Sequence, residues 1–307
     1  MSIVLMLPMD YSILIPVYNE DVTELVHSLH QQMLLLEQSG ELIILDDASP
    51  SVAVRKRNQE LGKLENVIYR ESNENIGRSR ARNKLADLSS GKGLLYLDAD
   101  VSIPSNAFLK QYQDYFQREM VVVGGHYYSK QRPVHSLLLN WNYARKYEAK
   151  PAEVRQKNVY RGFISMNFLI PRTWIKTIGF PTNVKGWGHE DTLFGHLLEK
   201  KNLSVLHIDN PVLHLGLSEA SEYLKKQEEA IQQALVLAER YPGFSYRLME
   251  VHRNLPLAVK KVLHFSSNIL IPALSSCTRQ TNSPFLLNVY KLIYYNSAIL
   301  EKDGIPT

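Results

Sequence analysis

Apolar runs of strand length alternate with polar segments over the first two thirds of the chain. The runs lie at 11–17, 42–45, 67–69, 94–97, 120–123, 163–170 and 203–208. Apolar residues at helical spacing predict helices between them, at 22–36, 73–88, 104–116, 172–178 and 190–198. This order predicts an α/β fold with a mostly parallel central sheet flanked by helices, whose strands end in polar loops, where such sheets bind ligands.

The α/β alternation stops near residue 217, and from Glu219 onward the composition is helical throughout. We therefore expect a catalytic domain over 1–217 and a C-terminal helical region over 218–307. The segment 127–157 has no clean period, and we expect a long helical or mobile insertion there, with no role assigned.

Two carboxylates, Asp98 and Asp100, follow the apolar run 94–97 directly. A buried strand would therefore deliver both acids to the edge of a sheet. Acids placed there can bind Mg²⁺ or Mn²⁺, which prefer hard oxygen ligands and can neutralise a diphosphate. The spacing also occurs in ordinary surface turns, so the pair alone does not decide the function.

Further polar residues have both a structural and a functional interpretation. The basic residues of 78–84 form either a solvated helix face or partners for phosphates and carboxylates. Glu190 and Asp191 open a helix, where acids ordinarily serve as caps, but Gly186, Trp187 and Gly188 just before them indicate a loop shaped against a ligand. His214 follows a strand, where a lone histidine is more often structural than a ligand.

Composition narrows the class of protein. The chain is 45% hydrophobic and 21% charged, which provides for a sizeable core. The net charge of +4 does not indicate a nucleic-acid binder, although it suits an anionic substrate or an acidic membrane surface. One cysteine, Cys277, allows no intramolecular disulfide. We see no signal peptide and no transmembrane segment, and we expect a cytoplasmic protein.

Taken together, the motifs resemble glycosyltransferase family 2, the inverting nucleotide-sugar enzymes with the GT-A fold. The matching segments are 15–20, 45–49, 75–83, 97–100 and 186–191. The last of them, with its Trp-Gly-x-Glu-Asp order, is most similar to the galactosyltransferase and chondroitin-polymerase-like branch. The resemblance covers roughly residues 10–216.

The resemblance implies a donor site and a metal site. Its nucleotide-binding residues would be Pro16, Tyr18, Glu20, Asp47, Arg82 and Asp98. The ring of Tyr18 would pack on the base, Asp47 would accept a hydrogen bond from uracil, and Arg82 would fix the diphosphate or Asp98. Asp100 would bind Mn²⁺ or Mg²⁺ directly, with Asp98 shared between ribose and metal. His214 would be a further metal ligand.

The resemblance also implies the catalytic base, Asp191. Inversion needs a carboxylate that removes the proton of the acceptor hydroxyl while that oxygen attacks the anomeric carbon. Glu190 would bind acceptor hydroxyls, and Trp187 would stack on a sugar face. The implied reaction moves a hexose from a UDP-sugar to a saccharide or lipid-linked saccharide in glycan biosynthesis.

Two other functions stay open. A non-catalytic module could bind nucleotide sugars or glycans on the same fold. A nucleotidyltransferase would share the metal carboxylates, but the expected Gly-rich, Lys-containing triphosphate loop is missing near the N-terminus. A dinucleotide dehydrogenase is disfavoured, because no Gly-x-Gly-x-x-Gly follows the first strand.

The helical region 259–300 also has two interpretations, because it mixes apolar residues with Lys260, Lys261 and His264. Its helices either pack onto the catalytic domain or make a peripheral membrane contact, at the inner face of the cytoplasmic membrane.

Overall fold

The computed structural model describes residues 9–182 and 188–302. The chain divides into two compact units. Unit 1 consists of Met1–Tyr127, Lys150–Thr182 and Leu197–Gly216, and unit 2 of Tyr128–Ala149, Asn183–His196 and Leu217–Thr307. The division of function at residue 217 stays a prediction.

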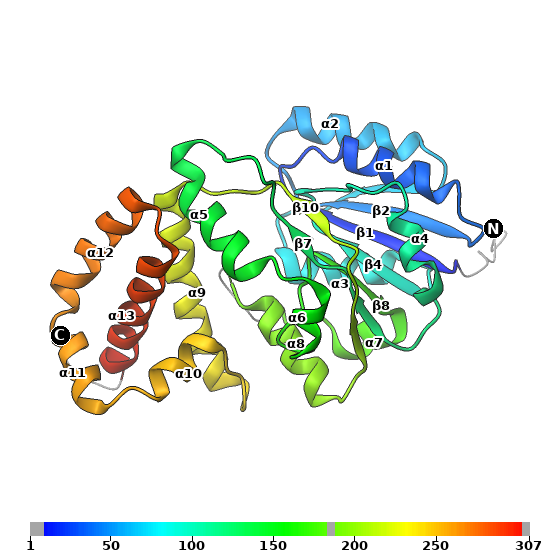
Figure 1. Cartoon of the computed structure of the whole chain (residues 1–307). Helices are drawn as coiled ribbons and strands as arrows, with labels where there is room; N and C mark the ends of the chain where they lie inside the picture. The colour runs from blue at the N-terminus through cyan, green and yellow to red at the C-terminus, as the bar shows by residue number, and fades with distance from the viewer. Residues whose placement is uncertain (1–8, 183–187, 303–307) are drawn as a thin grey trace. The chain divides into compact units, whose positions relative to one another are not determined.

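Unit 1 is built on a seven-stranded sheet in the order β3-β2-β1-β4-β8-β6-β9 (Figure 1). Its strands are β1 (Tyr11–Val17), β2 (Gly40–Asp46), β3 (Val67–Glu71), β4 (Gly93–Leu97), β6 (Val121–Val123), β8 (Asn167–Pro171) and β9 (Val205–His207). All pairs are parallel except those that β8 makes with β4 and β6. The α/β fold with a mostly parallel sheet is therefore confirmed.

The parallel register brings the ends of β1, β2 and β4 to one edge of the sheet, because Tyr11 of β1 lies opposite both Gly40 and Gly93. The loops that carry the predicted nucleotide and metal residues leave from this edge.

Helices cover both faces of the sheet. They are α1 (Thr23–Met33), α2 (Val52–Glu60), α3 (Arg78–Leu88), α4 (Phe108–Tyr112), α6 (Ala152–Gln156) and α7 (Arg172–Ile178). Apolar side chains of α1 and α4 form one core with Ile13 and Ile15 of β1. Side chains alternate across a strand, and Tyr96 of β4 faces the opposite side, where its hydroxyl donates to the carbonyl of Arg82 in α3 at 3.1 Å.

A second sheet of unit 1 has the order β5-β10-β7, with β5 (Val101–Ser102), β7 (His126–Tyr127) and β10 (Val212–His214). These strands were not predicted, because two or three residues are too few to show a period. The predicted helix 104–116 is shorter than expected, since α4 begins only at Phe108 and gives way to a 3₁₀ turn at Gln113–Tyr115. The predicted strand 163–170 begins only at Asn167.

Unit 2 is helical in the described residues (Figure 1). Its helices are α5 (Leu138–Tyr143), α9 (Ala220–Arg240), α10 (Arg247–Arg253), α11 (Leu257–Phe265), α12 (Ser267–Thr281) and α13 (Pro284–Lys302). A π-helical stretch at Ala144–Glu148 follows α5, and helix α8 (Glu190–Lys200) begins in unit 2 and ends in unit 1. Much of the segment 127–157 is thus helical, and the C-terminal helices are confirmed. No helix in the described part of the chain has both the length and the hydropathy for a bilayer crossing.

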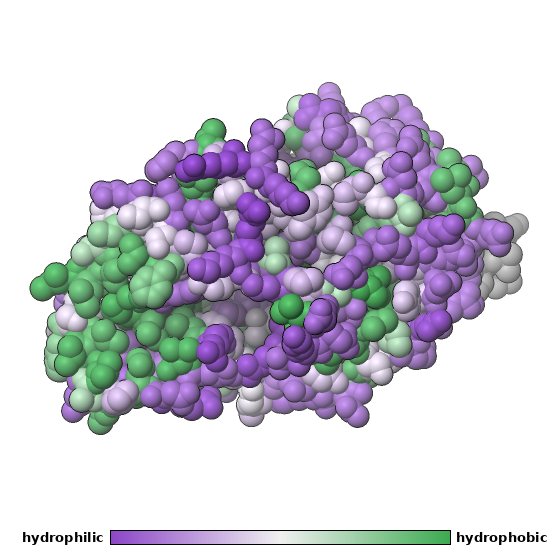
Figure 2. Space-filling view, viewed as in Figure 1, coloured by the Kyte–Doolittle hydropathy of each residue, from purple (hydrophilic) through white to green (hydrophobic). Residues whose placement is uncertain are grey.

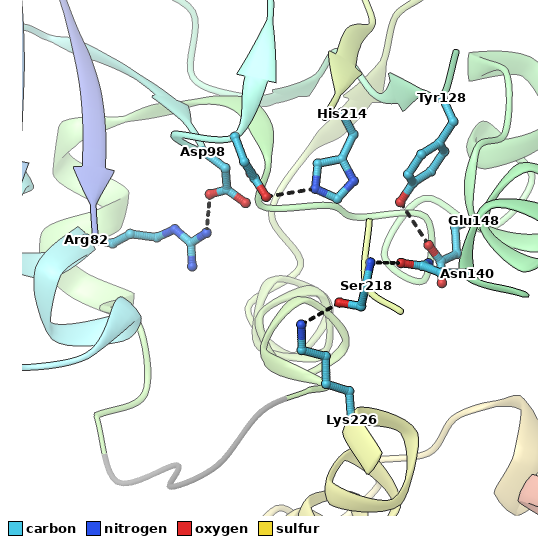
Figure 3. Close-up of polar contacts among 9 residues, drawn as sticks. Arg82, Asp98, Tyr128, Asn140, Glu148, His214, Ser218 and Lys226 are labelled. Atoms are coloured by element: carbon cyan, nitrogen blue, oxygen red, sulfur yellow. Dashed lines mark hydrogen bonds and ion pairs between the residues drawn. The ribbon is translucent and has the colours of Figure 1, made fainter. Parts of the chain in front are cut away.

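Polar contacts fix the start of α9 against the helices before it. The backbone N–H of Ser218 donates to Asn140 Oδ1 at 2.9 Å, and Lys226 Nζ donates to Ser218 Oγ at 2.6 Å (Figure 3). The hydroxyls of Tyr128 and Tyr223 both donate to the carboxylate of Glu148, each at 3.2 Å. Residues 128–149 therefore belong structurally with α9.

Candidate active site

The predicted nucleotide residues lie where β1 and β2 end. Pro16 is in β1, and Tyr18 follows the strand with its side chain 53% exposed, available to a ligand. Asn19, at φ 58°, turns the chain between Tyr18 and Glu20. This turn is held to the β2 loop, because the N–H of Asn19 donates to Ser49 Oγ at 2.7 Å.

Asp47 follows β2 and is buried. Its two carboxylate oxygens each accept a hydrogen bond at 2.8 Å, one from the N–H of Ile76 and one from that of Gly77. Gly77 is the N-cap of α3 and has φ 81°, a conformation that favours glycine. Asp47 thus positions the start of α3, and each oxygen keeps a lone pair for a further donor.

Arg82 and Asp98 form an ion pair at the end of β4. Arg82 is buried, and its Nη2 donates to Asp98 Oδ1 at 2.6 Å (Figure 3). The guanidinium also lies over the ring of Phe180, 5.3 Å from its centre. We expected Arg82 to fix either the diphosphate or Asp98, and the structure pairs it with Asp98. One side of this carboxylate is thereby held in place.

Asp100 meets His214 because β5 and β10 pair antiparallel and set His214 opposite Val101. Asp100 Oδ2 lies 3.0 Å from His214 Nε2. Gly216 lies beside both groups, and a Cβ there would come within 2.4 Å of Asp100 Oδ2 and 3.0 Å of His214 Nε2. Glycine therefore leaves open the space around this pair.

The electrostatics connect this pair to the β1 loop. Burial alone would raise the pKa of Asp100, but the hydrogen bond and charge of His214, together with a backbone hydrogen bond and the charge of Arg78, lower this pKa below its usual value. The pKa of Glu20 is raised by burial and by the negative charge of Asp100. Glu20 of the β1 loop therefore lies within electrostatic range of Asp100.

The donors fit a divalent cation. A carboxylate and an imidazole are ligands that Mn²⁺ accepts, and Gly216 keeps bulk away from both. Within 9–182 and 188–302, no three His, Cys, Asp or Glu side chains come together as a metal cluster. Oxygens of a diphosphate and water would have to complete the coordination, as is usual for cations that bind with a nucleotide.

His126 is a residue of this region that the sequence did not single out. It lies in β7, and its ring centre is 6.1 Å from that of His214. Burial and the nearby charges of His214 and Arg155 lower its pKa to about 4, so the ring stays neutral at pH 7. The only signal in the sequence was the Gly124-Gly125 pair before it, which carries no chemistry by itself.

Glu190 and Asp191 open helix α8 in unit 2, as predicted. Before them, Gly188 has φ 107° and a Cβ there would lie 2.6 Å from that of Ala230 in α9, so only glycine fits. Glu190 Oε2 accepts the N–H of Gly188 at 3.1 Å, so this carboxylate is held against the loop that precedes the helix. Trp187 lies outside the described residues.

We expect His189 to make the fold acid-sensitive. Its ring is 4.1 Å from that of Tyr246, and burial with the charge of Lys291 lowers its pKa to about 3. An unfolded histidine titrates near 6.5, so the unfolded state binds more protons below that pH. The contribution of His189 to the free energy of unfolding is therefore fully present above pH 6.5 and is lost as the pH falls toward 3. Between pH 7 and pH 5 this residue alone lowers the free energy of unfolding by about 2 kcal/mol.

Urea unfolding of wild type and His189→Asn at pH 7 and pH 5 measures this effect. Asparagine tolerates the φ of 64° at this position. The variant should be less stable at pH 7, because it loses the ring contact, yet should lose less stability on acidification. His27→Asn, at an exposed position of α1, is the control and should keep the wild-type pH dependence. If His189→Asn loses as much stability between pH 7 and pH 5 as the wild type does, His189 is not the source of the acid sensitivity.

The chain is similar in sequence to known glycosyltransferases. The model of the family described as glycosyl transferase family 2 matches residues 12–179. Poly(ribitol-phosphate) beta-glucosyltransferase from Bacillus spizizenii is 36% identical over 107 residues, which are 34% of this chain and 17% of that protein. The chain thus matches only a small part of this longer relative.

Solved structures share the fold over nearly the whole chain. A mannosyltransferase from Pyrobaculum calidifontis, in complex with GDP-Man and Mn²⁺, has a TM-score of 0.58 at 15% identity, covering 97% of this chain and 88% of that one. S. aureus TarS 1–349 in complex with UDP has a TM-score of 0.50 at 16% identity, covering 96% and 92%. The expected GT-A fold with C-terminal helices is confirmed, whereas the branch that the Trp-Gly-x-Glu-Asp order indicates stays a prediction.

Proposed function

The chain belongs to glycosyl transferase family 2, and on this basis we propose that it transfers a hexose from a UDP-sugar, with inversion, to a hydroxyl group of a saccharide or polyol-phosphate acceptor. The observation that carries the proposal is the arrangement after β4, where Arg82 holds Asp98 and His214 holds Asp100. Two carboxylates with different partners can take different parts in holding a cation and a ribose.

In this proposal the nucleotide lies across the ends of β1 and β2. Tyr18 has an exposed ring on which a base can stack, and Pro16 and Glu20 flank it. Asp47 accepts a hydrogen bond from uracil with a lone pair that the N–H groups of Ile76 and Gly77 leave free. The same carboxylate therefore orders the start of α3 and reads the base.

Asp100 and His214 would hold Mn²⁺ or Mg²⁺, with Asp98 shared between the cation and the ribose. A bound cation supplies neutralisation of the charge that develops on the leaving diphosphate. Arg82 contributes by fixing Asp98 at 2.6 Å, so that this carboxylate does not need to reorganise when the donor binds.

Asp191 is proposed as the base that takes the proton from the acceptor hydroxyl. Its position in the first turn of α8 places it near the positive end of the helix dipole, which stabilises the carboxylate ion. Glu190 and Trp187 are proposed to bind the acceptor sugar or polyol. Inversion at an α-linked UDP-sugar gives a β-linked product, which agrees with the beta-glucosyl product in the name of the Bacillus spizizenii relative.

A panel of nucleotide sugars tests the proposal. The full chain is incubated with Mn²⁺ and UDP-glucose, UDP-GlcNAc, UDP-galactose or GDP-mannose, and release of the nucleoside diphosphate is followed. We expect slow hydrolysis of one UDP-sugar and little of GDP-mannose. Addition of poly(ribitol-phosphate) or the correct saccharide should speed release by about tenfold or more, because the acceptor hydroxyl is held in place where water is not.

Each part of the proposal can fail separately. Preference for GDP-mannose would contradict the UDP assignment but not sugar transfer. If no donor releases its nucleotide, whichever acceptor is present, the transferase proposal itself is contradicted.

The exposed free thiol of Cys277 suits a reducing compartment, and we propose that the reaction takes place in the cytoplasm.

A further inference from the structure

Helices α11, α12 and α13 carry large apolar side chains that face solvent. Val262, Phe265 and Ile269 are 66%, 63% and 76% exposed, and Leu257 and Phe285 are 63% and 66% exposed. We call these five residues the apolar surface of unit 2. Figure 2 shows hydrophobic residues gathered over these same helices. Single exposed apolar residues are common, but a gathered surface marks an interaction site.

Helices α11 and α12 turn apolar side chains to solvent. Val262 and Phe265 of α11 and Ile269 of α12 are exposed, although α12 also has a packed side, where Ile271 and Leu274 lie against the buried cluster of unit 2. The few fully buried side chains of the two helices are polar: His264, Ser267 and Thr278. A water-facing helix normally turns polar side chains outward. The exposed apolar residues therefore indicate that an apolar medium or partner covers this face.

The chain segment that carries this surface is basic. Between Glu250 and Glu301 the chain has five basic residues and no acidic one, whereas the net charge of the whole chain is only +4. The remainder of the chain is therefore net negative by one, and the basic excess lies in this helical segment. Lys260 and Lys261 lie directly within α11, beside the exposed Val262. The partner should be apolar and negatively charged.

We propose that the apolar surface of unit 2 docks on an anionic lipid bilayer. Val262, Phe265 and Ile269 enter the boundary between head groups and acyl chains, and Lys260 and Lys261 lie at the level of the phosphates. A second copy of the chain would offer apolar contact, but a symmetric interface would bring two basic surfaces together and repel. A bilayer supplies both the apolar medium and the negative charge. The inference does not depend on the proposed sugar transfer.

Flotation of the full chain with vesicles tests this. We expect binding to vesicles of phosphatidylglycerol with phosphatidylcholine, and about tenfold weaker binding to phosphatidylcholine alone, since each basic residue near an anionic surface contributes about 1 kcal/mol. About 0.5 M salt should release the protein, because it shortens the screening length to about 4 Å.

Two sets of variants separate the apolar and charged contributions. Phe265→Ser with Ile269→Ser should reduce partition by about tenfold or more, since each side chain loses apolar burial. Lys260→Gln with Lys261→Gln should reduce it by about tenfold and weaken the salt dependence. The matched controls are Leu35→Ser, at a position 81% exposed in unit 1, and Lys200→Gln with Lys201→Gln, a pair of neighbouring exposed lysines outside this surface.

Three results would overturn the proposal: no flotation with anionic vesicles, equal flotation with neutral and anionic vesicles, or wild-type flotation of both surface variants. Light scattering on the same variants identifies the alternative occupant. If Phe265→Ser with Ile269→Ser converts a dimer to a monomer without changing flotation, the surface binds a second copy of the chain.

Discussion

Asp191→Asn should lower kcat of sugar transfer by about 10³-fold and leave the affinity for UDP unchanged, because loss of a general base costs about 10²- to 10⁴-fold. Asparagine has the shape of aspartate and still suits the first turn of a helix, but it cannot accept the acceptor proton. The proposed nucleotide contacts, Tyr18 and Asp47, belong to unit 1, whereas Asp191 belongs to unit 2. Binding and turnover should therefore separate in this variant.

Glu199→Gln is the matched control, since Glu199 is an exposed acid near the other end of the same helix. It should keep wild-type kcat. UDP titration by calorimetry confirms that each variant is folded. If Asp191→Asn keeps more than about a tenth of wild-type kcat, another group removes the proton. If the wild type binds UDP-sugar but never turns over, the chain is a binding module rather than an enzyme.

The strand ends of the site were predictable because their signal is local. A run such as Leu94 to Leu97 followed by two acids needs only neighbouring residues to be recognised, and the parallel register then brings Asp47 and Asp98 to one edge. The pairing of Arg82 with Asp98 was one of two partners expected, and the structure shows that pair.

What could not be predicted depends on contacts distant in sequence. His126 and His214 meet only because β7 and β10 pair, and strands of two or three residues have no period to detect. The requirement for Gly188 arises from Ala230, forty-two positions later in the chain. The outward face of α11 was also hidden, because periodicity defines a stripe but does not say which side the protein covers.

Packing within the helical region and a membrane contact do not exclude each other, whereas packing onto the catalytic domain stays a prediction. Leu287 and Tyr290 of α13 are buried against Tyr223 and Leu224 of α9, as helix packing requires. Ile271 and Leu274 of α12 pack against the same cluster, whereas Ile269 of α12 and Phe265 of α11 face solvent. One side of these helices can thus fix the unit while another side faces a bilayer.

Asp100→Ala should lower kcat/KM by about 10³-fold at fixed Mn²⁺, because it removes both the proposed charged ligand and the partner of His214 at 3.0 Å. EDTA should abolish the activity of the wild type, and Mn²⁺ or Mg²⁺ should restore it.

His214→Gln should raise the Mn²⁺ concentration needed for half-maximal activity by about ten- to a hundredfold, since one proposed ligand is lost and Asp100 remains. Asp114→Asn, an exposed acid of unit 1, is the control and should behave as wild type.

Gly216→Ala tests the same site without removing a donor. A Cβ at this position would lie 2.4 Å from Asp100 Oδ2, so the carboxylate must turn away from His214. Mn²⁺ binding, measured by calorimetry in the presence of UDP, should weaken in Gly216→Ala, in Asp100→Ala and in His214→Gln. If Asp100 and His214 serve one cation, as proposed, their double variant should bind Mn²⁺ little worse than Asp100→Ala alone. Strictly additive losses, or full activity in EDTA, would contradict a shared metal site and leave the pair with a structural role.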